Sequence, residues 1–241
     1  TEDYKELVHE AVYVKYPLEG KLDEYLLIWT TTPWTLPANV AVAVDPKINY
    51  VLAGSEHSKD KYFLSQDSAE KLKLKIIDSF KGNKLIGQIY ASPFDELERV
   101  KNALGNYKHR VVASDERILP VTTVEGTGMV HVATGAGTED FALGKKNNLP
   151  VIDVIDEEAN YLNGLGDFSN KNAKKHPEII IEFLQTQNYL FKKERYKHRY
   201  PACWRCKTEL VWRVVDEWYI AIDPVRLAMK KVARKIRWIP S

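Results

Sequence analysis

The apolar residues of this chain come in short runs, and the length of these runs limits the fold more than any other feature. The longest uncharged apolar runs, at residues 25–29 and 40–44, have five residues each. A membrane-spanning helix needs about 20 residues, whereas runs of this length fit single strands of a buried sheet. We therefore expect no transmembrane helix and no secretory h-region, and the pattern favours a fold with many short strands.

The spacing of apolar runs and turn residues predicts both strands and helices. Strands are expected at residues 11–16, 24–29, 40–44, 49–52, 84–90, 110–113 and 128–133, and helices at 67–73, from 138 onward, at 172–187 and at 224–235. Ser65 is a candidate N-cap for the first of these helices. The pattern is typical of a mixed α+β, β-barrel-like domain with peripheral helices.

The composition changes toward the C-terminus. From about Tyr196 the chain is basic, rich in tryptophan and carries both cysteines, so we expect one domain at residues 1–195 and a C-terminal Cys-containing subdomain at 196–241. The net charge of +2 argues against a general nucleic-acid coat, and the C-terminal basic residues are first interpreted as a solvated face. Two cysteines cannot form a disulfide framework, which indicates a reducing, cytoplasmic compartment. Because the chain begins with Thr1, we expect it to be part of a longer protein.

A threonine-rich segment follows the second expected strand. Residues 29–37 read Trp-Thr-Thr-Thr-Pro-Trp-Thr-Leu-Pro, and the prolines stiffen the backbone. Hydroxyl groups both donate and accept hydrogen bonds, so this segment can hold a water molecule, a sugar hydroxyl or an ester carbonyl. Threonine also favours strands for structural reasons alone, and the residues by themselves leave both interpretations open.

A second unusual segment lies at residues 126–141. A glycine turn leads into a strand that carries His131, and a second glycine loop leads into a helix with Asp140 in its first turn. A carboxylate there can receive an ammonium group, and we expect helix N–H groups to keep it ionised. The loop lacks the lysine of a phosphate-binding motif, and a single histidine on a strand is more often structural than catalytic.

Neither segment contains a nucleophile with a matching base. There is no Gly-x-Ser-x-Gly elbow, no His-x-x-x-His pair, and no His–Asn context for either cysteine. If the chain is an enzyme, it positions a water molecule and polarises a bond, without a covalent intermediate.

Both segments resemble the signatures of one family. The residues from Trp29 to Asn39 are similar to the threonine-rich signature of the editing domain inserted into class I isoleucyl-tRNA synthetases. The sequence Gly-Thr-Gly-x-Val-His ending at His131, with Asp140 nine residues later, resembles the second signature of that family. The resemblance covers essentially the whole chain, and residues 200–207 and 218–220 resemble the return of the insertion toward the synthetic core.

Single residues separate this chain from related families. The first signature of the leucyl and valyl enzymes resembles Thr-Thr-Arg-Pro, with arginine at the position of Thr32 in this chain. The valyl enzyme carries lysine at the position of His131. Both differences indicate isoleucine. Thr134 stands where the family has proline, which predicts a changed loop before Gly135.

The resemblance implies hydrolysis of valine mischarged onto isoleucine tRNA, after transfer and also at the valyl-adenylate stage. A pocket for isoleucine cannot strongly reject valine, because one methylene is worth only about 1–3 kcal/mol. By position, Thr30, Thr31, Thr32 and Asp140 form the catalytic set, and Trp29, Thr35, His131 and Asp140 bind the substrate. Asp140 binds the α-ammonium, His131 and Thr35 limit side-chain size, and Trp29 with the three threonines lines the terminal adenosine and the water. A ribose hydroxyl of the tRNA, and no side chain, activates that water.

The resemblance also defines cofactors and partners. Editing needs no cofactor, and the synthetic signatures His-Ile-Gly-His and Lys-Met-Ser-Lys-Ser are absent, so ATP binding belongs to the full-length protein. The expected partners are mischarged tRNA(Ile), valyl-adenylate and the rest of the synthetase in cis, with no membrane and a monomeric chain.

Cys203 and Cys206 have zinc-ligand spacing, but a structural zinc takes four ligands and His198 is the one nearby addition. Cysteines outside the insertion complete such a pair in the family, so we expect free thiols here and zinc in the full-length protein.

Two other functions remain open. A non-catalytic tRNA-docking insertion would not need the Thr30–Thr32 segment together with Asp140. A zinc-ribbon nucleic-acid module centred on Cys203 and Cys206 requires stoichiometric zinc and leaves residues 1–195 unexplained.

Overall fold

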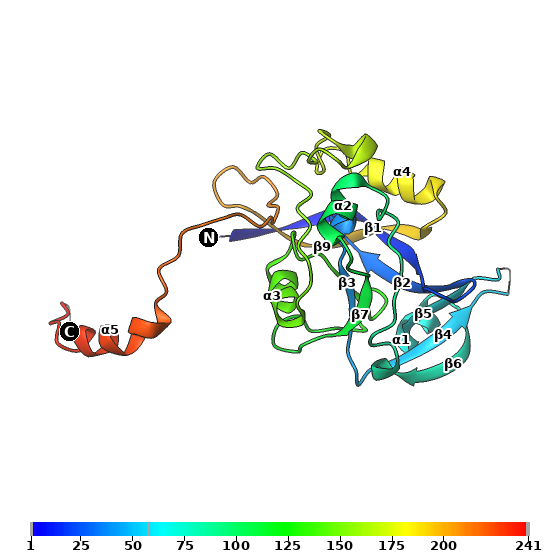
Figure 1. Cartoon of the computed structure of the whole chain (residues 1–241), viewed down its shortest axis with the longest axis horizontal. Coiled ribbons are helices and arrows are strands. Elements are labelled where there is room, and N and C mark those ends of the chain that lie inside the picture. The colour runs from blue at the N-terminus through cyan, green and yellow to red at the C-terminus, as the bar shows by residue number, and fades with distance from the viewer. Residues whose placement is uncertain (1, 57, 240–241) are drawn as a thin grey trace.

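The computed structural model describes residues 2–56 and 58–239 (Figure 1). Its strands are β1 (Glu2–Pro17), β2 (Glu24–Thr30), β3 (Ala41–Val44), β4 (Asn49–Gly54), β5 (Lys61–Ser65), β6 (Lys75–Lys81), β7 (Arg110–Ala113), β8 (Val130–Val132) and β9 (Leu190–Cys203). Its α-helices are α1 (Gln66–Lys71), α2 (Glu98–Leu104), α3 (Thr138–Asn147), α4 (Glu178–Thr186) and α5 (Arg226–Ala233). Short 3-10 turns are η1 (Pro33–Ala38), η2 (Gly82–Lys84), η3 (Gly166–Phe168) and η4 (Asp223–Val225).

The described strands form two open sheets. The larger has the order β6-β4-β5-β2-β1-β9, and the smaller has the order β7-β3-β8. The predicted α+β class is confirmed, although neither sheet closes on itself, so the expected barrel-like form is matched only loosely. The end of β2, from the larger sheet, lies against β8 of the smaller sheet, and both contribute to the candidate site.

The centre of the larger sheet, at β2 and β5, is buried on both faces, which explains the unbroken apolar sequence of β2. Leu26 and Ile28 point into the main core, together with the fully buried β3. Leu27 points the other way and packs with Leu64 and α1 residue Ala69 in a smaller cluster. Successive strand residues face opposite sides of a sheet, so a strand covered on both sides needs no polar alternation.

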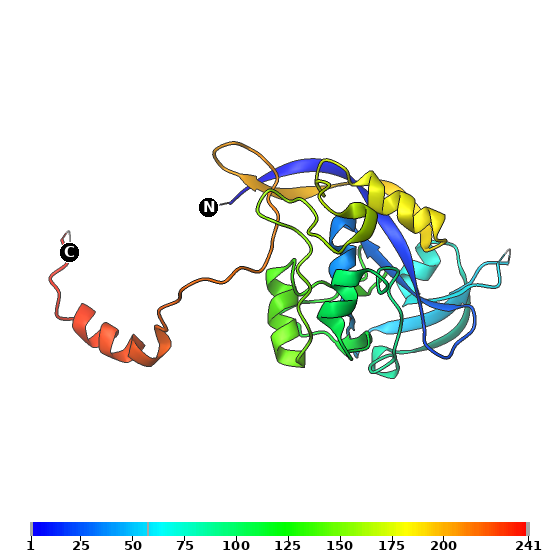
Figure 2. The same ribbon diagram turned by 45° about the horizontal axis from the view of Figure 1, so that its top comes forward.

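The strands β1 and β9 form a long antiparallel ribbon and lie side by side in Figure 2, with pairs running from Glu2↔Cys203 to Val14↔Leu190. The sequence did not predict the first half of β1 or most of β9. Both segments carry many charged residues, and cross-strand ion pairs such as Lys197–Glu6 at 2.8 Å join them. The predicted division at residue 196 falls inside β9, and the two-domain organisation remains a prediction.

Several expected elements differ in the structure, each for a local reason. Residues 84–90 form no strand, because Gly87 takes a φ of +86° in a turn and only isolated bridges follow at Ile89 and Tyr90. The helix expected at 172–187 begins at Glu178, since Pro177 disfavours a helical residue before it. By contrast, Ser65 caps α1 as predicted, accepting a hydrogen bond from the Ser68 N–H at 3.3 Å.

The C-terminal segment extends away from the two sheets (Figure 1), and α5 buries none of its residues. Trp218, Tyr219 and Ile220 on this segment are exposed. In the part of the chain that the structure describes, no helix combines the length and apolar character needed to cross a membrane.

Candidate active site

One cavity of about 250 Å³ brings the two unusual segments together. Its walls come from the end of β2, from η1, from the loop before β8, from β8 and from the start of α3. Every residue predicted for the site lines it: Trp29, Thr30, Thr31, Thr32, Thr35, His131 and Asp140. The structure therefore places the threonine segment and the acidic helix start on the same cavity, while the role of each residue remains a prediction.

The threonines form a shelf with fixed hydroxyl groups. The Thr32 N–H donates to Thr30 Oγ1 at 3.1 Å, and the hydroxyls of these two residues are also 3.1 Å apart. Thr35 Oγ1 donates to the Thr32 carbonyl at 2.9 Å, which ties the start of η1 to the shelf. Pro33 and Pro37 stiffen the following turn. These bonds hold several polar atoms in set positions at the cavity wall.

His131 forms a buried wall beside the shelf and has an exposed fraction of only 8%. Nε2 lies 3.1 Å from Thr35 Oγ1, and Nδ1 lies 2.7 Å from Asn39 Nδ2. The pKa of His131 is lowered to about 4, chiefly by burial; a hydrogen bond with the Thr35 backbone opposes this shift, and the electrostatic interaction with His109 contributes to it. The ring is therefore neutral at pH 7.

Asp140 lies in the first turn of α3 and is half-buried. Burial raises the pKa of Asp140 to about 7, the charge of Glu139 adds to this, and a hydrogen bond from the Ala133 backbone opposes it. Asp140 is therefore only partly ionised near pH 7, whereas the sequence predicted that it would stay ionised. No cation among the described residues pairs with Asp140, so a positively charged ligand would supply the missing partner and ionise the group.

Glycine leaves room for the functional side chains at two places. A Cβ on Gly137 would overlap Oδ2 of Asp140, so the glycine permits the carboxylate to lie against the loop. Gly126 has a φ of +67°, and a Cβ there would lie 2.8 Å from the ring of Trp29. The Trp29 ring also meets Tyr196 edge-on, with centroids 5.1 Å apart, so this indole is held from two sides.

Other cavity residues were not predicted from the sequence. Thr122, Glu125 and Thr127 also line the cavity, and a hydrogen bond with Glu125 raises the pKa of Tyr196 to about 12. Thr127 lies within the second signature, so its position in that motif could have been a signal. Nothing local marks Glu125, because its link to Tyr196 joins a loop to a distant strand.

Sequence comparison with curated relatives decides the family. The chain is 40% identical over 250 residues to the isoleucine–tRNA ligase of Pyrococcus horikoshii and 35% identical over 245 residues to that of Saccharolobus islandicus. The chain belongs to the isoleucyl-tRNA synthetase family. Each alignment covers 99% of this chain and 23% of the relative, so the chain spans about a quarter of the length of these synthetases. No family model matches the chain.

Solved structures share the fold at low sequence identity. The crystal structure of GlLeuRS-CP1 is 14% identical, with a TM-score of 0.59 over 76% of this chain and 96% of that chain. The editing domain of the P. knowlesi cytosolic leucyl-tRNA synthetase is 12% identical, with a TM-score of 0.51 over 79% of this chain and 97% of that chain. The fold is thus shared between a segment of isoleucyl-tRNA synthetases and a leucyl-tRNA synthetase editing domain.

Thr134, where the isoleucyl-tRNA synthetase signature has proline, is buried beside the site. Its hydroxyl donates to the Pro150 carbonyl at 2.6 Å, and its methyl group packs against Gly144. The hydroxyl therefore ties the loop before Gly135 to the segment that follows α3.

The cysteine pair lies outside the cavity. Cys203 ends β9, and the exposed Cys206 contacts the Thr208 hydroxyl at 3.3 Å. Hydrogen bonds from Thr208, and then from Cys203, lower the pKa of Cys206 to about 7. Among the residues described, no group of three or more His, Cys, Asp or Glu side chains could hold a metal, and His198 bonds to His9 at 2.9 Å. The described residues therefore offer no four-ligand zinc site, and zinc in a full-length protein remains a prediction.

Proposed function

We propose that this chain hydrolyses valine from mischarged isoleucine tRNA, as the post-transfer editing domain of a synthetase. The observation that carries the proposal is the single cavity in which an unpaired, half-buried Asp140 faces a threonine shelf and a closed histidine wall. An aminoacyl ester has the matching features: a free ammonium group, an ester carbonyl and a small side chain.

In this proposal, different cavity residues bind different parts of the ester and the attacking water. Asp140 binds the α-ammonium, and Thr30, Thr31 and Thr32 bind the ester and the attacking water. The water oxygen bonds to the ester carbon, the bond from that carbon to the ribose oxygen breaks, and the ribose oxygen takes a proton. The products are valine and a free tRNA 3′ end. Both nitrogens of His131 are engaged by protein groups, so a ribose hydroxyl of the tRNA, rather than this ring, assists the water.

Size exclusion supplies the specificity in this proposal. His131 and Thr35 are bonded to each other at 3.1 Å and form a wall that cannot easily move. Protein interiors accommodate an extra methylene poorly, at about 1–3 kcal/mol. A side chain one methylene larger than valine is therefore excluded from the cavity even though the synthetic site accepts it.

Release of amino acid from Val-tRNA(Ile) and Ile-tRNA(Ile), measured with the 241-residue chain at pH 8, tests the proposal. We expect much faster release of valine. Asp140→Ala should remove about 2–5 kcal/mol of binding to the ammonium group, which corresponds to a loss of about 30-fold to several thousand-fold in kcat/KM.

Glu139→Ala is the matched control, because Glu139 is the neighbouring carboxylate in the same helical turn, is exposed, and does not line the cavity. It should keep the activity of the parent chain. Equal activity of the Asp140→Ala variant and the parent contradicts the anchor role. A chain that binds tRNA and releases neither amino acid is a docking module instead.

The proposal extends to the partners of the domain. The exposed apolar residues at 218–220 are expected to contact the rest of the synthetase in cis, and the chain is expected to act as a monomer in the cytoplasm. Valyl-adenylate carries the same ammonium group and side chain as valyl-tRNA, so it is a second candidate substrate for the same cavity.

A further inference from the structure

The two ring nitrogens of His131 both contact polar groups whose hydrogen-bond directions can be assigned. Asn39 is the key to this assignment, because its Nδ2 lies 3.0 Å from the Ala41 carbonyl oxygen. A carbonyl oxygen only accepts hydrogen bonds, so the amide nitrogen of Asn39 must point toward it. The second proton of the same nitrogen then points to Nδ1 of His131, at 2.7 Å.

This geometry places the ring proton of His131. Because Nδ1 accepts from Asn39, it carries no proton, and the neutral ring must hold its proton on Nε2. That proton faces the hydroxyl oxygen of Thr35 at 3.1 Å. The Thr35 hydroxyl in turn donates to the Thr32 carbonyl at 2.9 Å. Every group in this series of hydrogen bonds has a donor or acceptor role that is consistent with its neighbours.

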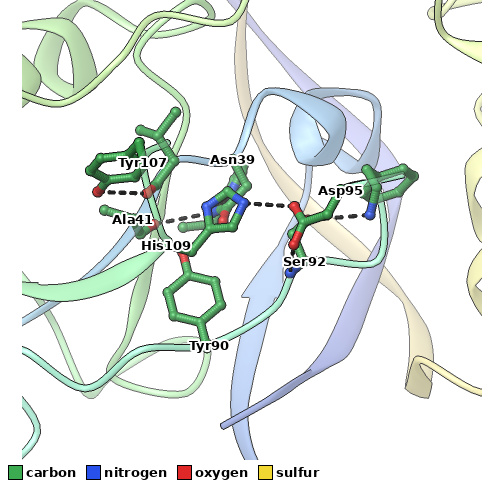
Figure 3. A network of polar contacts seen from close by, with 10 residues as sticks. Asn39, Ala41, Tyr90, Ser92, Asp95, Tyr107 and His109 are labelled. Atoms are coloured by element: carbon green, nitrogen blue, oxygen red, sulfur yellow. Dashed lines mark hydrogen bonds and ion pairs between the residues drawn. The ribbon is translucent and has the colours of Figure 1, made fainter. Parts of the chain in front are cut away.

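Tyr90 extends this series of hydrogen bonds on the other side of Asn39. Its hydroxyl donates to Oδ1 of Asn39 at 2.7 Å, and burial raises the pKa of Tyr90 well above its usual value, so the hydroxyl keeps its proton. Its ring stacks on Tyr16 and on His109, with centroid distances of 5.3 Å in both cases. Figure 3 shows Tyr90 with Asn39 and with the neighbouring His109–Asp95 pair, which are bonded at 2.7 Å.

We propose that Tyr90 is a positioning residue that, through Asn39, holds His131 in one tautomer and so keeps the side-chain wall of the cavity rigid. The inference rests on the proposed function, because it assigns the discrimination between valine and isoleucine to that wall. Tyr90 is not among the residues that line the cavity, and it lies outside both sequence signatures. Without the Tyr90 hydroxyl, the Asn39 amide is held by the Ala41 carbonyl alone, so the amide and the His131 ring gain freedom to tilt.

The test is Tyr90→Phe in the full chain, which keeps the stacked ring and removes one hydroxyl. Two quantities are measured: the ratio of kcat/KM for Val-tRNA(Ile) to that for Ile-tRNA(Ile), and the tautomer of His131 from its ring ¹⁵N chemical shifts. A single hydrogen bond of this kind corresponds to a change of about 2- to 10-fold. We expect the ratio to fall by that factor, through faster release of isoleucine, and the His131 ring to become a mixture of tautomers.

Tyr107→Phe is the matched control. The Tyr107 hydroxyl donates to the Val40 carbonyl at 3.1 Å, next to Asn39 in the sequence but off the chain to His131, so both readouts should match the parent. Asn39→Asp is a second variant, in which an acceptor replaces the donor facing Nδ1, and it should move the ring proton to Nδ1.

The outcomes separate the two proposals. An active parent chain whose Tyr90→Phe variant keeps the parent ratio and the parent tautomer overturns the inference alone. The inference is also overturned if Tyr107→Phe changes both readouts as much as Tyr90→Phe. A parent chain that releases neither amino acid overturns the proposed function, and the ¹⁵N shifts of the variants then decide separately whether Tyr90 sets the His131 tautomer.

Discussion

Two polar side chains in the cavity wall, His131 and Asp140, differ in how their polar atoms are satisfied. His131 has both nitrogens bonded within the protein, to Thr35 and Asn39. Asp140 receives a backbone hydrogen bond but faces no cation among the described residues. Burial favours the neutral form of both groups, lowering the pKa of His131 to about 4 and raising the pKa of Asp140 to about 7.

The difference suits two different roles: His131 fits a fixed wall, and Asp140 fits a receptor for a positively charged group. A buried group with all its partners inside the chain costs little to keep and moves little, which suits a surface that excludes a larger side chain. A buried carboxylate without a cation is destabilising until a positive ligand arrives, which suits the recognition of an ammonium group. Each of the following experiments alters one wall and leaves the other intact.

The largest effect is expected from Asp140→Asn, which keeps the size of the receptor and removes its charge. Protonation below pH 7 removes the carboxylate of the parent, so its kcat/KM for Val-tRNA(Ile), relative to spontaneous hydrolysis, should rise through about pH 7. The Asn variant should be at least about 30-fold slower at pH 8 and show no such rise. A pH profile shared by both proteins would remove Asp140 from the site. Glu139→Gln sharpens the test, because loss of the Glu139 charge should move the midpoint to lower pH.

The next largest effect is expected in the pH dependence of the free energy of unfolding, to which Asp140 and His131 contribute in opposite directions. The folded pKa of Asp140, about 7, exceeds its usual 3.8, so its contribution to the free energy of unfolding falls as pH rises from about 4 to 7. The folded pKa of His131, about 4, lies below its usual 6.5, so its contribution rises from about pH 4 to 6.5. Asp140→Asn removes the first effect alone.

Denaturant unfolding of parent and Asp140→Asn at pH 4 and pH 8 measures this difference. We expect the variant to be more stable than the parent by about 1–3 kcal/mol at pH 8, and to lose this advantage at pH 4. An equal difference at the two pH values would mean that Asp140 does not carry the raised pKa.

A smaller effect is expected from Gly137→Ala, which displaces the receptor without changing its chemistry. The φ of Gly137 is −157°, so alanine fits the backbone, but its Cβ would overlap Oδ2 of Asp140. The carboxylate must swing away, and kcat/KM for valine release should fall about tenfold. The free energy of unfolding should stay the same or rise, because alanine restricts the unfolded chain. Full activity in this variant would show that the position of the carboxylate is not critical.

The smallest effect is expected at the wall, from Thr35→Ser compared with Thr35→Val. Serine keeps the bonds to His131 and the Thr32 carbonyl but lacks the methyl group, so it should admit isoleucine and raise its release a few-fold, by about 1 kcal/mol. Valine keeps the volume but loses both hydrogen bonds, which should lower stability by about 0.5–1.5 kcal/mol per bond. Identical Val:Ile ratios in the two variants and the parent would exclude Thr35 from size selection.

The parts of the fold that could be predicted are those that depend on neighbouring residues. The Ser65 cap, the start of α3 at Thr138 and the buried β2 and β3 all follow from local patterns. The first half of β1 and β9 could not be predicted, because each is stabilised by the other across nearly two hundred residues of chain. Residues 84–90 look like a strand, but the turn at Gly87 and the contacts of Tyr90 depend on distant segments.

The candidate site divides in the same way. Sequence alone determined which residues are candidates, because the threonine segment and the Gly-Thr-Gly segment are continuous in the chain and carry their chemistry in order. Only the tertiary structure decided that both segments line one cavity, that Asp140 has a raised pKa, and that hydrogen bonds connect Tyr90 through Asn39 to the ring of His131. The physical reason is that burial and hydrogen-bond direction depend on all the atoms around a group, and most of those atoms come from residues far away in the sequence.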